Sequence, residues 1–240
     1  MTATRHAHEP PGGTLSAAIL AVVTFSLFVA LAVIVTSHRR PFRIDRSAAH
    51  HLGSAKGSSA FRFGEVVSLF GKGPVVALVA LAIGAVILYR VRRLFIAGAI
   101  PAAAAASGIL ELGTKYVVRR PRPPTASLTG QSGYGFPSGH TTGFTAMVVA
   151  LVGVLASLGY RHRVVILTAV VAALATVAIG LSRVVVGAHW ATDVIGGGLL
   201  GAATASVVML CAWVGPTILP GLDQLLAPKQ GRPGQRQPSR

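Results

Sequence analysis

The sequence is poor in charged residues, and in acidic residues above all. Only 12% of its 240 residues are charged, and Asp and Glu together number 6. A water-soluble domain of this length carries about 25% charged residues, so the composition argues against a soluble enzyme. Six acidic residues are also too few to favour a carboxylate-rich metal site. We therefore expect no metal in this protein.

Cysteine is almost absent as well. The single cysteine, Cys211, lies within an apolar run, so no intramolecular disulfide can form. No phosphate-cradling loop follows it, which also argues against a cysteine nucleophile. Cysteine content therefore indicates little about the compartment.

Positive charge is abundant, in contrast. The 22 Lys and Arg residues give a net charge of +16 with histidine neutral. Nucleic-acid binding would require a basic stripe on a soluble face. Here the basic residues form short clusters between long apolar runs, which is typical of a membrane protein. We expect membrane lipids, and no nucleic acid, as partners.

Apolar runs account for most of the chain. A helix needs about 20 apolar residues to cross the hydrocarbon core, and six runs come near that length: 15–36, 74–89, 94–112, 141–160, 164–182 and 191–214. The sequence predicts an all-α, integral membrane bundle of six helices over 15–220. A segment 1–14 precedes it, a disordered basic tail follows at 221–240, and residues 44–52 are predicted to form a short surface helix.

Alternation of the spans decides which loops share a compartment. Segments 115–140 and 182–193 border one side of the membrane, and both termini lie on the other. With the N-terminus in the cytoplasm, ten basic residues lie inside and twelve outside, of which five belong to the two segments just named. Without those five, the positive-inside rule favours cytoplasmic termini and an extracytoplasmic site in the cell membrane, although Arg39 and Arg40 argue the other way.

Polar residues gather at span ends on that side, where ionisable groups are costly and usually functional. His189 and Asp193 are four residues apart and share a helix face. The carboxylate can accept a proton from one ring nitrogen and leave the other free as a base or nucleophile. Alternatively, the two residues form a pair that only neutralises both.

A second cluster, Pro137-Ser138-Gly139-His140, precedes the fourth span. Ser138 is a good N-cap residue and Gly139 allows close backbone approach to a ligand, so the helix start is a candidate anion site. The alternative is an ordinary turn with a bystander histidine.

The third cluster is basic. Arg122 can hold a phosphate through two parallel hydrogen bonds, and Lys115 supplies a point charge. Such residues alone are more often topology signals or headgroup anchors, and Glu111 can pair with Lys115. The combination of two histidines, one aspartate, several cations and a helix N-terminus favours phosphoryl transfer without a metal.

These positions resemble the three-part signature of the type 2 phosphatidic acid phosphatase and vanadium haloperoxidase superfamily. The signature positions are Lys115 with Arg122 and Pro123, then residues 137–140, then Ser182-Arg183, His189 and Asp193. Because of the six spans, the chain resembles the membrane lipid phosphatase branch. The resemblance implies no metal or cofactor, and a substrate such as phosphatidate, phosphatidylglycerophosphate or a polyprenyl diphosphate of the undecaprenyl or decaprenyl type.

The resemblance also implies a role for each residue. His189 would be the nucleophile that forms a phosphohistidine, Asp193 would orient it, and His140 would protonate the leaving alcohol. The phosphate would be held by Lys115, Arg122, Ser138, Gly139 and Arg183. A lipid phosphotransferase and a phospholipid-binding or transport protein without catalysis remain alternatives.

Small residues in the last span bear on assembly. Gly197 and Gly201 form a small-xxx-small pair that is expected to pack the sixth span tightly inside the same chain. A homodimer through this pair is the alternative.

Overall fold

The computed structural model describes residues 13–38, 40–219 and 222, so most of the predicted segments 1–14 and 221–240 lies outside the described residues. The regular structure of the described residues is entirely helical. Its elements are α1 (Thr14–Ser37), α2 (Arg43–Leu52), α3 (Ser59–Leu69), α4 (Gly73–Val91), α5 (Leu94–Val118), η1 (Pro124–Thr129), α6 (Gly139–Ser157), α7 (His162–Val185) and α8 (Ala191–Ile218).

Six of these helices, α1 and α4 to α8, are long and apolar enough to cross a membrane. They coincide with the six predicted spans, and α2 confirms the predicted surface helix. Large apolar side chains such as Leu78, Leu167 and Leu174 are exposed on the outer faces of the bundle. Lipid tails are as apolar as leucine, so these faces suit a bilayer. The chain is an integral, multi-pass membrane protein.

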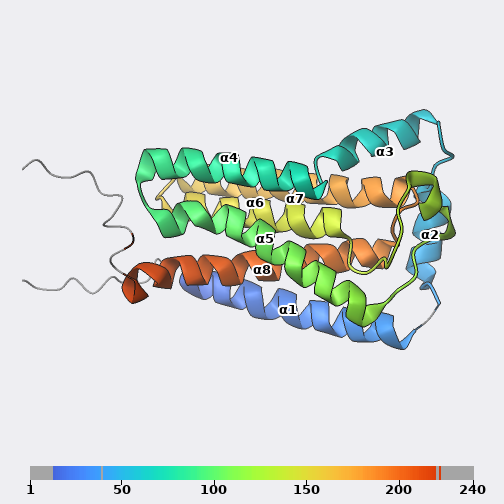
Figure 1. Ribbon diagram of the computed structural model, residues 1–240, viewed down its shortest axis with the longest axis horizontal. Coiled ribbons are helices and arrows are strands. Elements are labelled where there is room, and N and C mark those ends of the chain that lie inside the picture. The colour runs from blue at the N-terminus through green and yellow to red at the C-terminus, as the bar shows by residue number, and fades with distance from the viewer. Residues whose placement is uncertain (1–12, 39, 220–221, 223–240) are drawn as a thin grey trace, which may run out of the picture.

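The six long helices run side by side, and the short elements gather at one end (Figure 1). Helix α8 packs against α1, α5 and α6. The loops that precede α6 and α8 lie at the same end as α2 and α3, whereas the described start of α1 and end of α8 lie at the opposite end. The two predicted active-site segments therefore meet on one face, as the alternation of spans requires.

Glycines allow α8 to approach α6 closely. A Cβ atom built at Gly197 would lie 2.7 Å from the Ser138 carbonyl oxygen, and one built at Gly201 would lie 2.9 Å from Thr145 Cβ. Both glycines therefore face α6 of the same chain, which confirms the predicted packing. The homodimer stays a prediction.

Replacement of Gly201 by alanine is expected to destabilise the bundle by about 1–3 kcal/mol, because the added methyl group meets the backbone of α6. Gly198 is the matched control, since nothing lies within 4 Å of a Cβ atom built there. Thermal unfolding in detergent should show a lower midpoint for Gly201→Ala than for Gly198→Ala. Equal midpoints would contradict the close contact.

Candidate active site

The predicted site residues converge at the end of the bundle that carries α2 and α3. A cavity of about 450 Å³ is lined there by Lys115, Arg122, Gly139, His140 and His189. Arg183, Ser138 and Asp193 are buried, and Ser138 N donates to the Asp193 carbonyl oxygen over 2.9 Å. Arg183 lines a second cavity, which shares His140 with the first.

The histidine at position 189 is held by partners on both ring nitrogens. Nδ1 lies 3.4 Å from Asp193 Oδ2, and Nε2 lies 2.9 Å from Arg122 Nη1. Because a guanidinium only donates hydrogen bonds, Nε2 is the acceptor and Nδ1 carries the proton. The lone pair of Nε2 therefore accepts from Arg122, the cation expected to hold a phosphate.

Burial controls the protonation of this ring. It lowers the pKa of His189 from its usual 6.5 to about 4, helped by the charges of Arg122 and Arg183 and opposed by Asp193. Burial also lowers the pKa of Arg122, against the charges of Asp193 and Glu111. The imidazole is therefore neutral near pH 7, as a nucleophile must be.

The low pKa predicts that stability depends on pH. Between pH 6.5 and 4 the unfolded chain protonates His189 while the folded chain does not, so stability falls as the pH falls through this window. At pH 4 the expected loss is about 3 kcal/mol. Unfolding midpoints of the protein and of His189→Asn should converge on acidification. A difference that stays constant from pH 7 to pH 4 would contradict the shift.

Asp193 is itself anchored by residues that the sequence analysis did not identify as parts of the site. Arg120 donates from Nη1 to Asp193 Oδ1 and from Nη2 to Asp45 Oδ2, both over 2.5 Å. Asp45, on α2, is fully buried and accepts from the backbone N–H and the hydroxyl of Thr192. A chain of charges thus runs from α2 through Arg120 to the carboxylate behind His189.

Several buried polar atoms at this site have no hydrogen-bond partner in the part of the chain that the structure describes. Among the described residues, the buried side-chain atoms without a hydrogen bond include Arg122 Nε, Arg183 Nε and Nη2, and His140 Nε2. Buried polar groups are normally paired, and guanidinium donors require an acceptor. Arg122 contacts Nε2, and the charge of Arg183 acts on the same ring. Donors on these two residues suit an anion with several oxygens, such as a phosphate.

The start of α6 differs in detail from the prediction. Ser138 is the N-cap residue, but its side chain makes no capping hydrogen bond. Its hydroxyl instead accepts from Thr141 Oγ1 over 3.2 Å. The N-cap side chain therefore leaves the first-turn N–H groups of α6 uncapped, and this helix start is the feature that favours anion binding.

Lys115 forms an ion pair with Glu111, one helical turn earlier on α5, as its i,i+4 spacing allowed. Both residues line the first cavity. A Cβ atom built at Gly139 would lie 2.7 Å from Glu111 Oε1, so a glycine at this position leaves room for the carboxylate. Lys115 is therefore at the site, but it is neutralised by Glu111 when no other anion binds.

Away from the charged residues the first cavity is apolar. It continues between α4, α5 and α6, where it is lined by Val76, Ala77, Leu81, Ala104 and Ala105. We call this apolar part of the cavity the apolar lane. The charged end and the apolar lane together suit a lipid with a phosphorylated headgroup.

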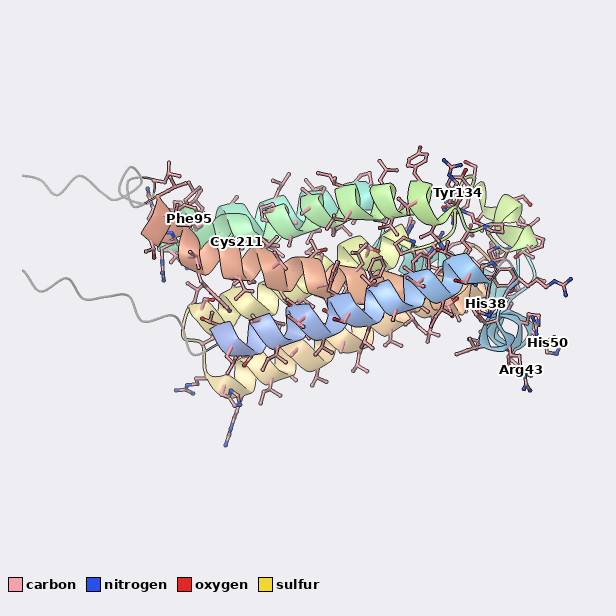
Figure 2. The ribbon with its side chains drawn as sticks, turned by 90° about the horizontal axis from the view of Figure 1, so that it is seen from below. His38, Arg43, His50, Phe95, Tyr134 and Cys211 are labelled. Atoms are coloured by element: carbon pink, nitrogen blue, oxygen red, sulfur yellow. The ribbon has the colours of Figure 1, made fainter. Side chains whose placement is uncertain are left out.

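The single cysteine, Cys211, is not part of the candidate site. Figure 2 shows Cys211 and Phe95 toward one end of the bundle, and His38, Arg43, His50 and Tyr134 at the other, which is the end of the candidate site. The expectation that Cys211 is not a phosphate nucleophile agrees with this position.

Known proteins are similar to this chain in sequence and in fold. The model of the PAP2 superfamily matches residues 94–215, which include all eight predicted site residues. Phosphatidylglycerophosphatase B of Bacillus subtilis (strain 168) is 35% identical over 88 residues, which are 35% of this chain and 42% of that protein. The chain thus matches less than half of the length of this curated relative.

A solved structure shows the same fold. The crystal structure of the first transmembrane PAP2 type phosphatidylglycerolphosphate phosphatase from Bacillus subtilis superposes with a TM-score of 0.69 at 22% identity, over 78% of this chain and 93% of that chain. The family match covers half of this chain, from α5 into α8, and carries every motif of the candidate site. The chain belongs to the PAP2 superfamily.

Proposed function

We propose that the protein is an integral membrane phosphatase that removes the terminal phosphate of a lipid through a phosphohistidine on His189. The observation that carries this proposal is the set of unpaired donors on Arg122 and Arg183 near the accepting Nε2 of His189, at the end of an apolar lane. None of the steps below uses a metal ion, so we predict that the activity does not depend on a metal.

In the first step, His189 Nε2 attacks phosphorus, and the bond from phosphorus to the lipid oxygen breaks. Arg122, Arg183, Lys115 and the N–H groups of the α6 start stabilise the charge on the phosphoryl oxygens. His140 donates a proton to the leaving oxygen. Asp193 accepts a hydrogen bond from Nδ1 of His189 and stabilises the positive charge that this ring gains.

In the second step, water attacks phosphorus and the bond from nitrogen to phosphorus breaks. His140, now neutral, takes a proton from the water, and His189 returns to its neutral form. Inorganic phosphate then leaves the site.

The substrate class follows from the apolar lane and the relatives. Phosphatidylglycerophosphate is the first candidate because the curated relative is a phosphatidylglycerophosphatase. Phosphatidate and a polyprenyl diphosphate also combine a terminal phosphate with apolar chains.

The proposed site faces the extracytoplasmic side of the cell membrane. The turns between α4 and α5 and between α6 and α7 lie at the other end of the bundle and carry Arg92, Arg93 and Arg161, with Arg163 in the first turn of α7. Short basic turns of this kind mark the cytoplasmic face.

The experiment is a phosphate-release assay in detergent with phosphatidate, phosphatidylglycerophosphate and a polyprenyl diphosphate, each with EDTA present. We expect release from at least one of them, undiminished by EDTA. Loss of activity with EDTA would overturn the metal-free mechanism. Transfer of the phosphate to an added alcohol, with little free phosphate, would identify a phosphotransferase instead.

A further inference from the structure

A second cavity reaches the site from the side of α3. It has a volume of about 460 Å³ and lies between α3, the start of α4, the end of α7 and the segment around η1. Its lining is more polar than that of the first cavity, and includes Arg62, Glu65, Lys72 and Gln131 beside the apolar Val66, Leu69 and Val186. His140 and Arg183 form its inner end.

The position of His140 places the inner end of this cavity beside the leaving oxygen. His140 lines both cavities, and in the proposed reaction it protonates the oxygen that leaves phosphorus. The backbone before Lys72 packs against this ring, since a Cβ atom built at Gly71 would lie 3.3 Å from His140 Cδ2. A group bonded to the leaving oxygen therefore lies near Lys72.

The segment at Lys72 also separates the two cavities. Lys72 lines the polar cavity, whereas the next residue, Gly73, lines the apolar one. An acyl or prenyl chain can follow the apolar lane past Gly73 while a polar group just ahead of it faces Lys72.

The cavity carries more positive charge than the terminal phosphate requires. That phosphate already has Arg122, Arg183 and Lys115. Arg62 and Lys72 add two further cations, both exposed, and neither takes part in an ion pair within the described residues. The cavity's acidic residue, Glu65, offsets one of them. A second anionic group on the leaving side would match this charge.

We propose that Lys72 and Arg62 form a subsite for a second phosphate, located between the scissile phosphate and the apolar chain of the substrate. This proposal rests on the proposed function and narrows it. The preferred substrates are lipids with two phosphorus groups, joined either as a diphosphate or through a phosphodiester and glycerol. Phosphatidate, which has a single phosphate, leaves the subsite empty.

The test compares kcat/KM for phosphatidate, phosphatidylglycerophosphate and a polyprenyl diphosphate in Lys72→Ala and Arg62→Ala. For at least one two-phosphate substrate we expect a loss on the order of tenfold, as for a charge-assisted hydrogen bond at a hydrated site, and a change of less than about twofold for phosphatidate. Lys72→Arg should keep most of the preference, and Glu65→Gln should strengthen it. The substrate that responds identifies the linkage between the two phosphates.

Lys56→Ala is the matched control, because Lys56 is exposed on the loop between α2 and α3 and lines neither of these cavities. Equal losses for all three substrates would mean that the cations only attract anionic lipid, and would overturn the subsite. Losses of the same size in Lys56→Ala would overturn it too. Absence of phosphate release from any substrate by the unmodified protein would overturn the proposed function itself, which is a separate outcome.

Discussion

Replacement of His189 by asparagine is expected to lower the rate of phosphate release by at least about 10³-fold, because the side chain that forms the bond to phosphorus is lost. Asparagine is polar and of similar length, so it can still contact Asp193 and Arg122, and the fold should survive. The remaining cations continue to bind substrate, so the loss should fall on kcat more than on KM.

Two measurements make this test sharp. Brief incubation with labelled substrate should trap an acid-labile phosphoenzyme in the unmodified protein and none in His189→Asn. His162→Asn is the control, since His162 is exposed at the start of α7, at the opposite end of the bundle. Activity of His189→Asn within about tenfold of the unmodified protein would exclude His189 as the nucleophile.

Replacement of Arg120 by alanine is expected to destabilise the protein by about 3–5 kcal/mol, the cost of breaking a buried ion pair from one side. Arg120 is 6% exposed and its two Nη atoms bond to Asp45 and Asp193. Its removal leaves two buried carboxylates unpaired, and it also removes the cation over the Phe42 ring. The thermal midpoint in detergent should fall sharply, and catalysis should fall with it because Asp193 loses its anchor.

Two further variants distinguish the loss of this ion-pair network from nonspecific destabilisation of the fold. Arg119→Ala is the matched control, because Arg119 is exposed and makes a local hydrogen bond to the Tyr116 carbonyl oxygen. If unpaired charge causes the loss, Asp45→Asn should recover part of the stability in the Arg120→Ala background. A double variant less stable than Arg120→Ala would contradict this explanation.

The sequence was sufficient for those features that depend on local pattern. The length of each apolar run against the thickness of a bilayer predicted six spans, and the alternation of spans brought the three polar clusters to one face. The pairing of Glu111 with Lys115 also followed from sequence, because residues four apart on a helix are neighbours whatever surrounds them.

Other parts of the site depend on contacts between distant segments. Asp45 and Arg120 are 75 residues apart in sequence, and neither belongs to a motif that predicts the other. In sequence Asp45 is one acidic residue in a basic surface helix, and Arg120 is one of several basic residues in a loop. These two residues support Asp193 only because folding buries them between α2 and α8.

By itself, then, the sequence determined the class of protein, the common face of the active-site segments and the residue types available for phosphoryl transfer, because apolar length, helical spacing and motif order are properties of the chain alone. The tertiary structure decided which ring nitrogen of His189 carries the proton, which carboxylates are buried, and that an apolar cavity and a more polar one meet at His140. Those features arise from desolvation and from hydrogen bonds between segments that only folding brings together.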